Sequence, residues 1–242
     1  MPSDALSELA PDGTLRAAIN MANSLLVTGS TSTGDPEGVA PGMAKAIAER
    51  LGAAVSFVPY ASPGELADAV DRNLWDICMI GAEPARAERI AFSAAYVEIQ
   101  ATYLVSDDAP FSSVEDIDRN GVRIAVSGRS AYDLYLTRSL EHAELCRAQG
   151  VSGAVELFVG DDLDALAGLR PALVLEARKL PETRVLNGHF TSIQQAIGTR
   201  RENEAGAEFL FEFVEEAKAI GLVGRLMERH GVTSRLSVAP PA

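Results

Sequence analysis

The hydrophobic positions in the first part of the chain alternate between two spacings. Short apolar runs that indicate strands occupy residues 14–20, 54–60 and 75–82. Helical patterns occupy residues 42–52 and 62–70 between these runs. The order strand, helix, strand, helix, strand with short links predicts an α/β fold, in which a mostly parallel sheet is flanked by helices.

The two helical patterns carry boundary signals of their own. The first repeats apolar side chains at the four-residue spacing of one helix face, at Met43, Ile47 and Leu51. Gly52 follows and predicts the end of that helix. In the second pattern, Ser62 suits the N-cap, Pro63 suits the first helical position, and Glu65 completes a capping box.

A second α/β cycle starts near residue 110. Residues 111–117 predict a capped helical turn, and residues 122–128 predict a strand. We expect a single helix over residues 130–148, opened by Ser130 with Asp133 three positions later.

The last third of the chain begins with further alternation of elements between residues 154 and 175. Residues 189–199 then predict an extended segment, residues 205–231 predict helices, and residues 237–242 predict a tail. The chain thus contains two α/β units, the first ending near residue 105. Because the joins are extended segments rather than Gly/Ser linkers, they favour hinge motion over free tethering.

The charge of the chain excludes two kinds of partner. Its 242 residues carry a formal net charge of −13. Binding to nucleic acid or to anionic lipid needs a basic face, so we expect neither. No run approaches the roughly 18 consecutive apolar residues of a membrane span. We therefore expect a soluble globular protein without membrane insertion.

The N-terminus bears on where the protein works. Residues 1–14 contain neither a basic n-region nor an apolar h-region, so they do not form a signal peptide. The expected location is periplasmic if a leader was removed, and cytoplasmic if Met1 is the native start.

Cysteine and histidine positions indicate no cofactor or metal. Cys78 lies in an apolar run and is expected in the core, and Cys146 lies in a helix-like segment, so we expect no disulfide. His142, His189 and His230 lack metal-ligand spacing. The sequence also lacks a P-loop, a dinucleotide-binding glycine pattern and a nucleophile elbow.

Four stretches occur in the order seen in one known family, namely residues 13–20, 37–60, 74–105 and 121–136. They resemble the bacterial solute-binding proteins of family 3, the amino-acid-type receptors of ABC importers, which have the type II periplasmic binding-protein fold. The most specific part is Arg86, followed six residues later by Phe92-Ser93 and then by Tyr96. The resemblance covers roughly residues 13–231.

The resemblance implies a two-lobed fold with a ligand cleft between the lobes and two extended crossover strands as the hinge. Lobe one would comprise residues 1–104 plus 188–242, and lobe two would comprise residues 105–187. The resemblance also implies a monomer that binds a small-molecule ligand, needs no cofactor, and serves an ABC permease if it is exported.

In lobe one, the resemblance assigns the binding of a ligand carboxylate to Arg86. A short helix starting at Pro84 would place Arg86 in its first turn, where the helix dipole disfavours a cation that holds no anion. The guanidinium can bind a carboxylate through two parallel hydrogen bonds. The alternative is a salt bridge from Arg86 to Glu83 or Glu88.

Gly81 and Glu83 stand where the family usually has small hydroxyl residues that line the same site. Glu83 departs from this family pattern. Its carboxylate would repel a bare anion but would pair with an ammonium group. The alternative is that it only neutralises Arg86. The aromatic residue that stacks on the ligand in the family is replaced near residues 20–27, where Asn23 suggests a polar ligand.

In lobe two, residues 127–133 match the family's turn at a helix N-terminus. Ser130 and the backbone amides of Ser130 and Ala131 are expected to receive an anion there, with Arg129 adding positive charge. The alternative is a capping box formed by Ser130 and Asp133, and both roles are compatible because backbone amides would remain available.

Lobe two also departs from the family at a position that bears on the ligand. Amino-acid-binding members hold the α-ammonium group with an aspartate after a strand, and the corresponding position falls near Leu169, beside Arg170. Either Glu83 has taken over the ammonium group, or the ligand is a carboxylate without one. Arg170 is included among the expected ligand contacts.

Three functions are compatible with these residues. The leading hypothesis is a solute-binding protein that closes around a small polar ligand bearing a carboxylate, amino-acid-like or an organic acid. The second is an enzyme similar to cyclohexadienyl (prephenate/arogenate) dehydratases, which needs a general acid in the cleft, whereas Arg86 would keep Glu83 ionised. The third is a ligand sensor that acts through a protein partner.

Overall fold

The computed structural model describes residues 2–242, which form two compact units. Unit 1 comprises residues 1–98 and 194–242, and unit 2 comprises residues 99–193. The chain passes from one unit to the other inside two strands, β6 (Ile90–Ser106) and β11 (Thr191–Arg200). The extended segment predicted at residues 189–199 is thus confirmed as a strand.

The sheet of unit 1 has a parallel centre. β1 (Thr14–Asn20) pairs in parallel with β4 (Ala54–Tyr60) and with β5 (Ile77–Gly81), and all three strands were predicted. β11 adds an antiparallel strand next to β5. β12 (Ser237–Val238) pairs with β6, so part of the expected tail belongs to the sheet. The sheet is therefore mixed.

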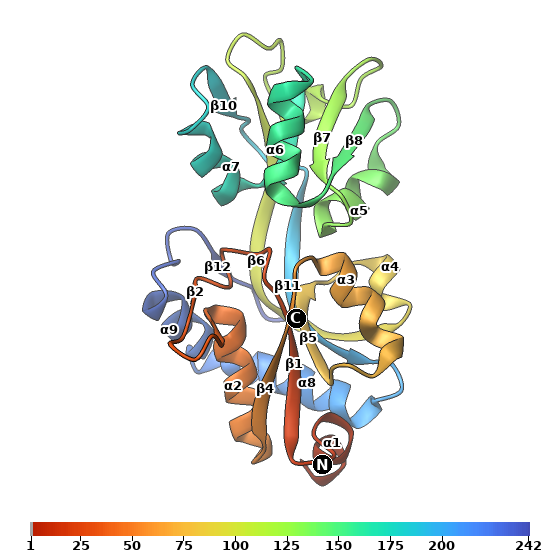
Figure 1. The fold of residues 1–242 in the computed structure, drawn as a ribbon, viewed down its shortest axis with the longest axis vertical. Coiled ribbons are helices and arrows are strands. Elements are labelled where there is room, and N and C mark those ends of the chain that lie inside the picture. The colour runs from red at the N-terminus through yellow and green to blue at the C-terminus, as the bar shows by residue number, and fades with distance from the viewer. Residues whose placement is uncertain (1) are drawn as a thin grey trace. The chain divides into compact units, whose positions relative to one another are not determined.

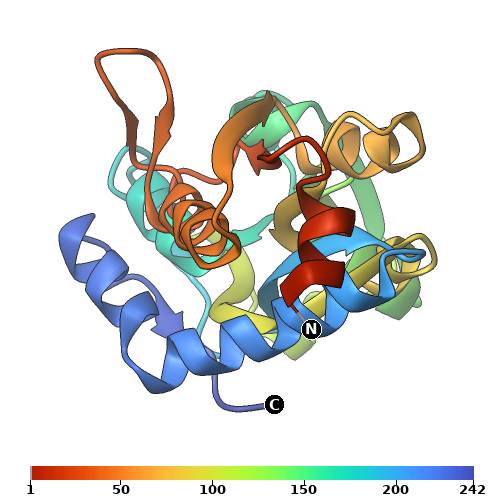
Figure 2. The same cartoon turned by 90° about the horizontal axis from the view of Figure 1, so that it is seen from below.

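Helices cover both faces of this sheet. They are α1 (Pro2–Leu9), α2 (Val39–Leu51), α3 (Pro63–Asp68), the 3-10 helix η1 (Ala69–Arg72), α4 (Pro84–Ala87), α8 (Glu204–Ala219) and α9 (Leu222–Arg229). Figures 1 and 2 show α2 and α3 on opposite sides of the sheet, with α1 packed against α8. The hydrophobic pattern predicted neither α1 nor the hairpin of β2 (Gly29–Ser30) and β3 (Pro36–Glu37).

Two predicted helix boundaries of unit 1, the start of α3 and the end of α2, are confirmed by their cap geometry. Ser62 Oγ accepts a hydrogen bond of 3.2 Å from the backbone nitrogen of Glu65, and Pro63 opens α3. α2 ends before Gly52, whose φ of 70° lies in the left-handed region that favours glycine. Local side-chain chemistry therefore fixes where these helices begin and end.

The sheet of unit 2 has a parallel centre, to which β6 adds antiparallel pairs. β7 (Arg123–Ser127) lies between β8 (Glu144–Ala148) and β9 (Ala165–Leu169) and is parallel to both. The unit 2 part of β6 pairs antiparallel with β9 and with β10 (Thr183–Val185). Side chains of β7 alternate between two apolar clusters, one on each face of the sheet.

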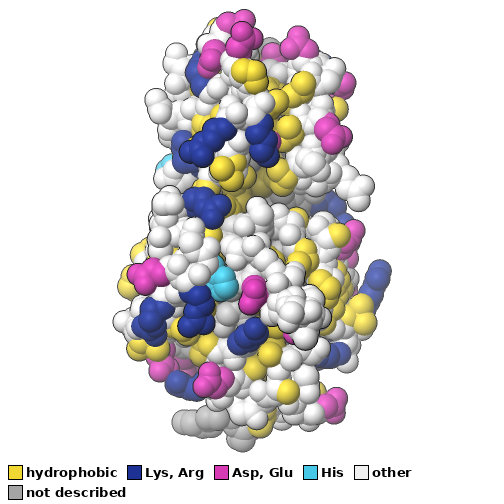
Figure 3. Space-filling model, turned by 60° about the vertical axis from the view of Figure 1, so that its left-hand side comes forward, with side chains coloured by type: hydrophobic (Ala, Val, Ile, Leu, Met, Phe, Trp, Pro, Cys, Tyr) yellow, Lys and Arg dark blue, Asp and Glu magenta, His cyan; other side chains and the backbone are white. Residues whose placement is uncertain are grey.

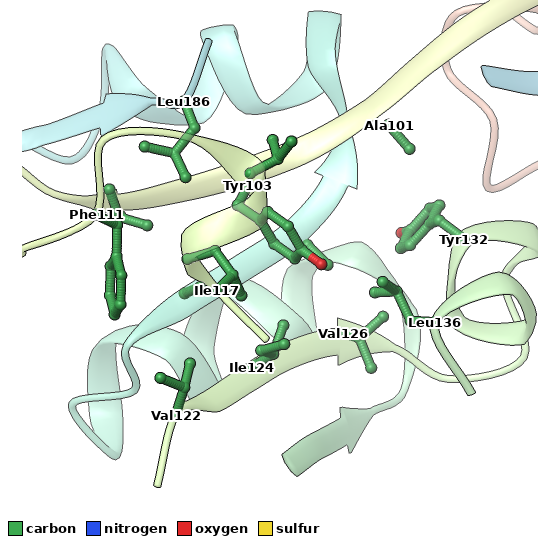
Figure 4. Packing of buried hydrophobic residues seen from close by; sticks show 14 of the residues in the cluster. Ala101, Tyr103, Phe111, Ile117, Val122, Ile124, Val126, Tyr132, Leu136 and Leu186 are labelled. Carbon is green, nitrogen blue, oxygen red and sulfur yellow. The ribbon is translucent and has the colours of Figure 1, made fainter. Parts of the chain in front are cut away.

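Each face of this sheet is covered by its own elements. Figure 4 shows the cluster on one face, where Tyr103 of β6 and Val126 of β7 pack with Leu136 of α5 (Ala131–Ser139) and with Ile117, which follows η2 (Val114–Asp116). The cluster on the other face is covered by α6 (Gly150–Gly160) and α7 (Arg170–Ala177), through Phe158 and Leu173.

The prediction of one helix over residues 130–148 was wrong. α5 ends at Ser139, and Leu140 is already extended, with φ −76° and ψ 138°. The carboxylate of Asp118 accepts hydrogen bonds from three successive backbone N–H groups, those of residues 141–143, at 2.8–2.9 Å. The chain then continues as β8, so Cys146 lies in a strand. The thiols of Cys78 and Cys146 are both reduced.

The surface mixes charges of both signs. On the face shown in Figure 3, basic and acidic side chains lie interspersed. Within residues 2–242, no helix has the length and apolar character needed to cross a membrane. In the same range, no group of three or more His, Cys, Asp and Glu side chains is placed to hold a metal ion.

Candidate functional site

The predicted ligand residues of unit 1 lie at or after the carboxyl ends of its parallel strands. Gly81 is the last residue of β5, Glu83 and Arg86 follow it, and Asn23 follows β1. Because β1 and β5 are parallel neighbours, their carboxyl ends share one edge of the sheet. Ligands of α/β proteins bind at this kind of edge.

Arg86 is buried in a single helical turn. α4 begins at Pro84, as predicted, so Arg86 is its third residue. Only 6% of its surface is exposed. Its Nη1 donates a hydrogen bond of 2.6 Å to the carbonyl oxygen of Gly81, which directs the guanidinium back over the end of β5. This neutral carbonyl satisfies one of the donors of the guanidinium.

Glu83 places a second buried charge in the same turn. It exposes 7% of its surface and occupies the N-cap position of α4. Its backbone carbonyl accepts hydrogen bonds of 2.9 Å from the nitrogens of Arg86 and Ala87. Its carboxylate does not cap the helix. The short turn thus brings one carboxylate and one guanidinium to the end of β5.

Cys78 of β5 is excluded as a nucleophile. Burial raises the pKa of its thiol to about 12, while a backbone hydrogen bond at Gly198 and the positive charge of Arg86 oppose that rise. The thiol is protonated at neutral pH and acts as a small core residue.

The Phe92-Ser93 motif has a structural role in this chain. Ser93 Oγ donates a hydrogen bond of 2.7 Å to the carbonyl oxygen of Ala94 and accepts one of 3.1 Å from the backbone nitrogen of Ile197. This hydroxyl therefore joins β6 to β11. Tyr96 is fully buried, and its burial raises the pKa of the phenol.

Asn23 organises the turn after β1. Its Oδ1 accepts a hydrogen bond of 3.2 Å from the backbone nitrogen of Leu25. Its backbone nitrogen donates a hydrogen bond of 3.3 Å to the carbonyl oxygen of Asn20. The side chain is half-buried. Asn23 therefore lies at the edge where it was expected, with its amide oxygen occupied by the backbone.

The predicted residues of unit 2 also follow strand ends. Arg129, Ser130 and Ala131 follow β7, and Arg170 follows β9, the parallel neighbour of β7. α5, which begins at Ala131, packs against β9. The structure therefore brings these four residues to one edge of the sheet of unit 2.

Ser130 caps α5 as predicted. Its Oγ accepts 3.1 Å from the backbone nitrogen of Asp133. Its own backbone nitrogen donates 3.3 Å to the carbonyl of Ser127, so the expectation that this amide stays available was wrong. The N–H group of Ala131 is at the first helical position, where a helix offers no internal partner.

Asp133 fixes the turn that carries Arg129. Arg129 adopts a φ of 62°, in the left-handed region that non-glycine residues rarely adopt. Asp133 Oδ2 accepts a hydrogen bond of 2.6 Å from the backbone nitrogen of Arg129, and Oδ1 accepts one of 2.9 Å from Nε of Arg147. Both carboxylate oxygens of Asp133 are thus occupied, and the residue exposes only 2% of its surface.

Among the described residues, Arg170 donates its hydrogen bonds to neutral groups. Its Nε donates 2.9 Å to the side-chain oxygen of Gln100, and its Nη2 donates to the carbonyls of Leu186, at 3.2 Å, and Gly188. Gln100 lies in β6, so Arg170 ties the strand that enters unit 2 to the segment that leads out of it. Leu169 packs against an apolar cluster of unit 2.

The carboxyl edge of the parallel strands in unit 2 is cationic. The residues that directly follow β7, β8 and β9 are 128–130, 149–150 and 170. They include two arginines and no Asp or Glu. The carboxylate of Asp133, in the first turn of α5, is already paired. This edge is therefore complementary to an anion.

Two α/β units joined inside strands, with charged residues at their strand ends, define a solute receptor of the type II periplasmic binding-protein class. The sequence profile of the bacterial extracellular solute-binding proteins, family 3, matches residues 7–233, and the chain belongs to this family. No curated protein sequence matches this chain.

Solved structures show the same fold. The cysteine-binding protein from Campylobacter jejuni superposes with a TM-score of 0.77 at 17% identity, over 96% of this chain and 94% of that chain. A mutant of ArgBP from T. maritima superposes with a TM-score of 0.75 at 21% identity, over 94% of this chain and 99% of that chain. The ancestral amino acid-binding protein AncCDT-1, a precursor of cyclohexadienyl dehydratase, superposes with a TM-score of 0.74 at 24% identity, over 93% of this chain and 98% of that chain.

The predicted family, fold and general function are thereby confirmed. The protein is a solute-binding protein that serves an ABC importer, and its family works outside the cytoplasm, in the bacterial periplasm. Binding rather than catalysis is the function of the family, so the dehydratase alternative fits less well.

Proposed function

We propose that this chain binds a small polar solute through a carboxylate group of that solute, which Arg86 holds, and passes the solute to an ABC permease. The observation that carries the proposal is the buried guanidinium of Arg86 at the carboxyl end of β5. A guanidinium binds a carboxylate through two parallel hydrogen bonds, so a ligand carboxylate suits this position.

Unit 2 supplies the second set of contacts in this proposal. Ser130, Ala131, Arg129 and Arg170 lie on a cationic edge that suits an anionic part of the solute. In a receptor that closes by hinge motion, contacts from both units stabilise the closed state. We place the hinge in β6 and β11, where the chain crosses between the units.

The ammonium group of an amino-acid-like solute has one candidate partner in this proposal. In unit 2 the position of the family's aspartate is taken by Leu169, and both oxygens of Asp133 are occupied. Glu83 is the carboxylate that shares the strand end with Arg86. An amino-acid ligand is therefore held at both of its charged groups by unit 1, beside Gly81 and Asn23.

A thermal-shift screen of ligand-stripped, refolded protein tests this function. The panel contains amino acids, mono- and dicarboxylates, polyamines and prephenate. A ligand at a hundred times its dissociation constant adds about 2.7 kcal/mol to the free energy of unfolding, which raises Tm by roughly 5–10 °C for a chain of this size. Arg86→Ala should abolish the shift.

Arg89→Ala is the matched control. Arg89 lies three residues from Arg86, is half exposed, and pairs with Asp71 on the surface. Its removal should leave the ligand-induced shift unchanged. A shift that survives in Arg86→Ala, or that only cationic compounds produce, contradicts the assignment of Arg86 to a carboxylate.

A further inference from the structure

Arg170 joins three parts of unit 2 at the place where the chain enters and leaves that unit. It directly follows β9 and opens α7. Its Nε donates a hydrogen bond of 2.9 Å to the side-chain oxygen of Gln100, which belongs to the entering segment, residues 99–103. Its Nη2 donates to the carbonyl oxygens of Leu186, at 3.2 Å, and of Gly188, which belong to the leaving segment, residues 186–193.

The leaving segment forms an arch beside the entering one. The backbone nitrogen of Leu186 donates a hydrogen bond of 2.9 Å to the carbonyl oxygen of Tyr103. The backbone nitrogen of Phe190 donates one of 3.0 Å to the carbonyl oxygen of Ala101. The leaving segment thus advances four positions where the entering segment advances two. Gly188 lies at the middle of this arch with a φ of 73°, and its carbonyl oxygen accepts from the guanidinium, which therefore supports the arch.

The place of Arg170 in α7 is unfavourable for a cation. It is the first residue of the helix, where the helix dipole disfavours positive charge. The three oxygens that accept its hydrogen bonds are neutral. What an arginine offers here is a planar group whose several donors reach different acceptors at once. Holding the two segments together therefore accounts for an arginine at this position.

A second side-chain contact joins the two crossings on the side of unit 1. Gln194 Nε2 donates a hydrogen bond of 2.7 Å to Glu98 Oε1. Glu98 is the last residue of unit 1 before the chain enters unit 2, and Gln194 is the first after it returns. Between this contact and that of Arg170 lie Ile99 on the way in and residues 189–193 on the way out. Hinges bend at a few residues of this kind, so the two contacts confine the bending to these positions.

We propose that Arg170 is a positioning residue of the hinge, which makes both crossing segments and the strand end of β9 move as one body when the receptor closes on its solute. This inference rests on the proposed function, because it assumes closure around a solute. Arg170 then acts on binding through the crossing segments, in addition to the charge that it brings to the edge of unit 2. Without this contact the closed state is populated less, and the apparent affinity falls with that population.

Isothermal titration of two variants tests the proposal. The probe is the tightest binder among L-glutamate, L-arginine, L-cysteine, succinate and glutarate. Arg170→Lys keeps the positive charge but loses the planar group with its several donors, so it should weaken binding about tenfold. Gln100→Met removes the acceptor in β6 and keeps the arginine, and it should weaken binding about threefold. A direct contact between Arg170 and the solute would instead leave Gln100→Met with native affinity.

The double variant and the closure of the protein show how Arg170 acts. If the arginine acts through β6, adding Gln100→Met to Arg170→Lys should weaken binding no further than Arg170→Lys alone. Small-angle X-ray scattering should show a decrease in the radius of gyration when the native protein is saturated with the probe. The decrease should be smaller in Arg170→Lys at saturation, and an equal decrease would contradict the proposal.

Arg184→Lys is the matched control. Arg184 lies in β10 and donates hydrogen bonds of 2.9 and 2.8 Å to the carbonyl oxygens of Ala109 and Phe111, within unit 2 but outside the crossing segments. This substitution should lower the urea midpoint about as much as Arg170→Lys does, and it should leave affinity and closure unchanged. An equal loss of affinity in both variants would make Arg170 a residue of fold stability only and overturn the inference.

The outcomes distinguish this inference from the function on which it rests. If Arg86→Gln abolishes binding of the probe while Arg170→Lys or Gln100→Met binds it with native affinity, the inference is overturned and the proposed function stands. If Arg86→Gln binds normally, the proposed role of Arg86 fails, and the variants of Arg170 and Gln100 still decide the role of the hinge contact. Weaker binding in all three variants, with native affinity in Arg184→Lys, supports both.

Discussion

Nη1 of Arg86 donates a hydrogen bond of 2.6 Å to the carbonyl oxygen of Gly81, the last residue of β5. The strand end thereby fixes the position of the guanidinium before any ligand arrives. A pre-positioned group loses less conformational entropy on binding, and this preorganisation favours affinity. In the proposed function, the main-chain conformation at Gly81 is therefore part of the binding site.

Glu83 should determine whether an amino acid binds. We expect Glu83→Gln to weaken the binding of zwitterionic amino acids by about tenfold or more, because a buried charge-assisted pair with their ammonium group is lost. Binding of plain carboxylates such as succinate should be unchanged or tighter, because a nearby negative charge is removed. Titration calorimetry of both ligand types measures the difference. Equal effects on both types would show that Glu83 serves only the fold.

Asp133 should stabilise the turn of unit 2 more than Ser130 does. Ser130→Ala removes an N-cap and is expected to cost about 1 kcal/mol of folding free energy. Asp133→Ala removes the acceptor for the backbone of Arg129 and for Arg147 and should cost about 2–3 kcal/mol. Urea unfolding of the two variants provides the comparison. A smaller loss for Asp133→Ala would contradict this account of the left-handed conformation of Arg129.

Gly198 should not tolerate a side chain. A Cβ atom there would clash with Ile90 and lie 2.9 Å from the sulfur of Cys78. We expect Gly198→Ala to cost about 1–3 kcal/mol through overpacking. Gly224→Ala is the control, since a Cβ at that position in α9 meets nothing within 4 Å, and it should stabilise by about 0.5–1 kcal/mol. A lower urea midpoint for Gly198→Ala and a higher one for Gly224→Ala would support both expectations, and equal shifts would refute them.

Cys78 should make the protein less stable in alkali. Burial raises the pKa of its thiol from 9.0 to about 12, so the unfolded chain releases the proton near pH 9 while the native state retains it. The stability that this group contributes is complete below pH 9 and is lost as the pH rises toward 12. At pH 10.5 the loss is roughly 2 kcal/mol, at 1.36 kcal/mol per pKa unit.

Cys78→Ala isolates this contribution. Urea unfolding at pH 8 and at pH 10.5 should show a larger decrease in the free energy of unfolding for the native sequence than for Cys78→Ala. Tyrosines and lysines titrate in both proteins, so their contributions cancel in the comparison. Equal decreases would mean that the thiol does not remain protonated in the native state.

Local patterns predicted most of the fold because their signals act over a few residues. Ser62, Pro63 and Gly52 mark helix ends through hydrogen bonds and backbone angles that neighbours in sequence supply. The helix predicted through residue 148 failed for the opposite reason. Asp118, more than twenty residues away in sequence, binds the backbone of residues 141–143 and redirects the chain into β8.

The site shows the same division between local and distant information. Arg86 could be predicted as a site residue from the sequence, because the short helix and the family motif surround it. The hydrogen bonds from Arg170 to Gln100 and Gly188 could not be predicted from the sequence, because they join segments that lie far apart along the chain.

A crystal structure of the protein with the tightest-binding carboxylate from the thermal-shift screen tests the central claim most directly. The account predicts a ligand carboxylate within hydrogen-bond distance of the guanidinium of Arg86. A carboxylate bound away from Arg86, or an Arg86 that contacts only protein atoms in the complex, would contradict it.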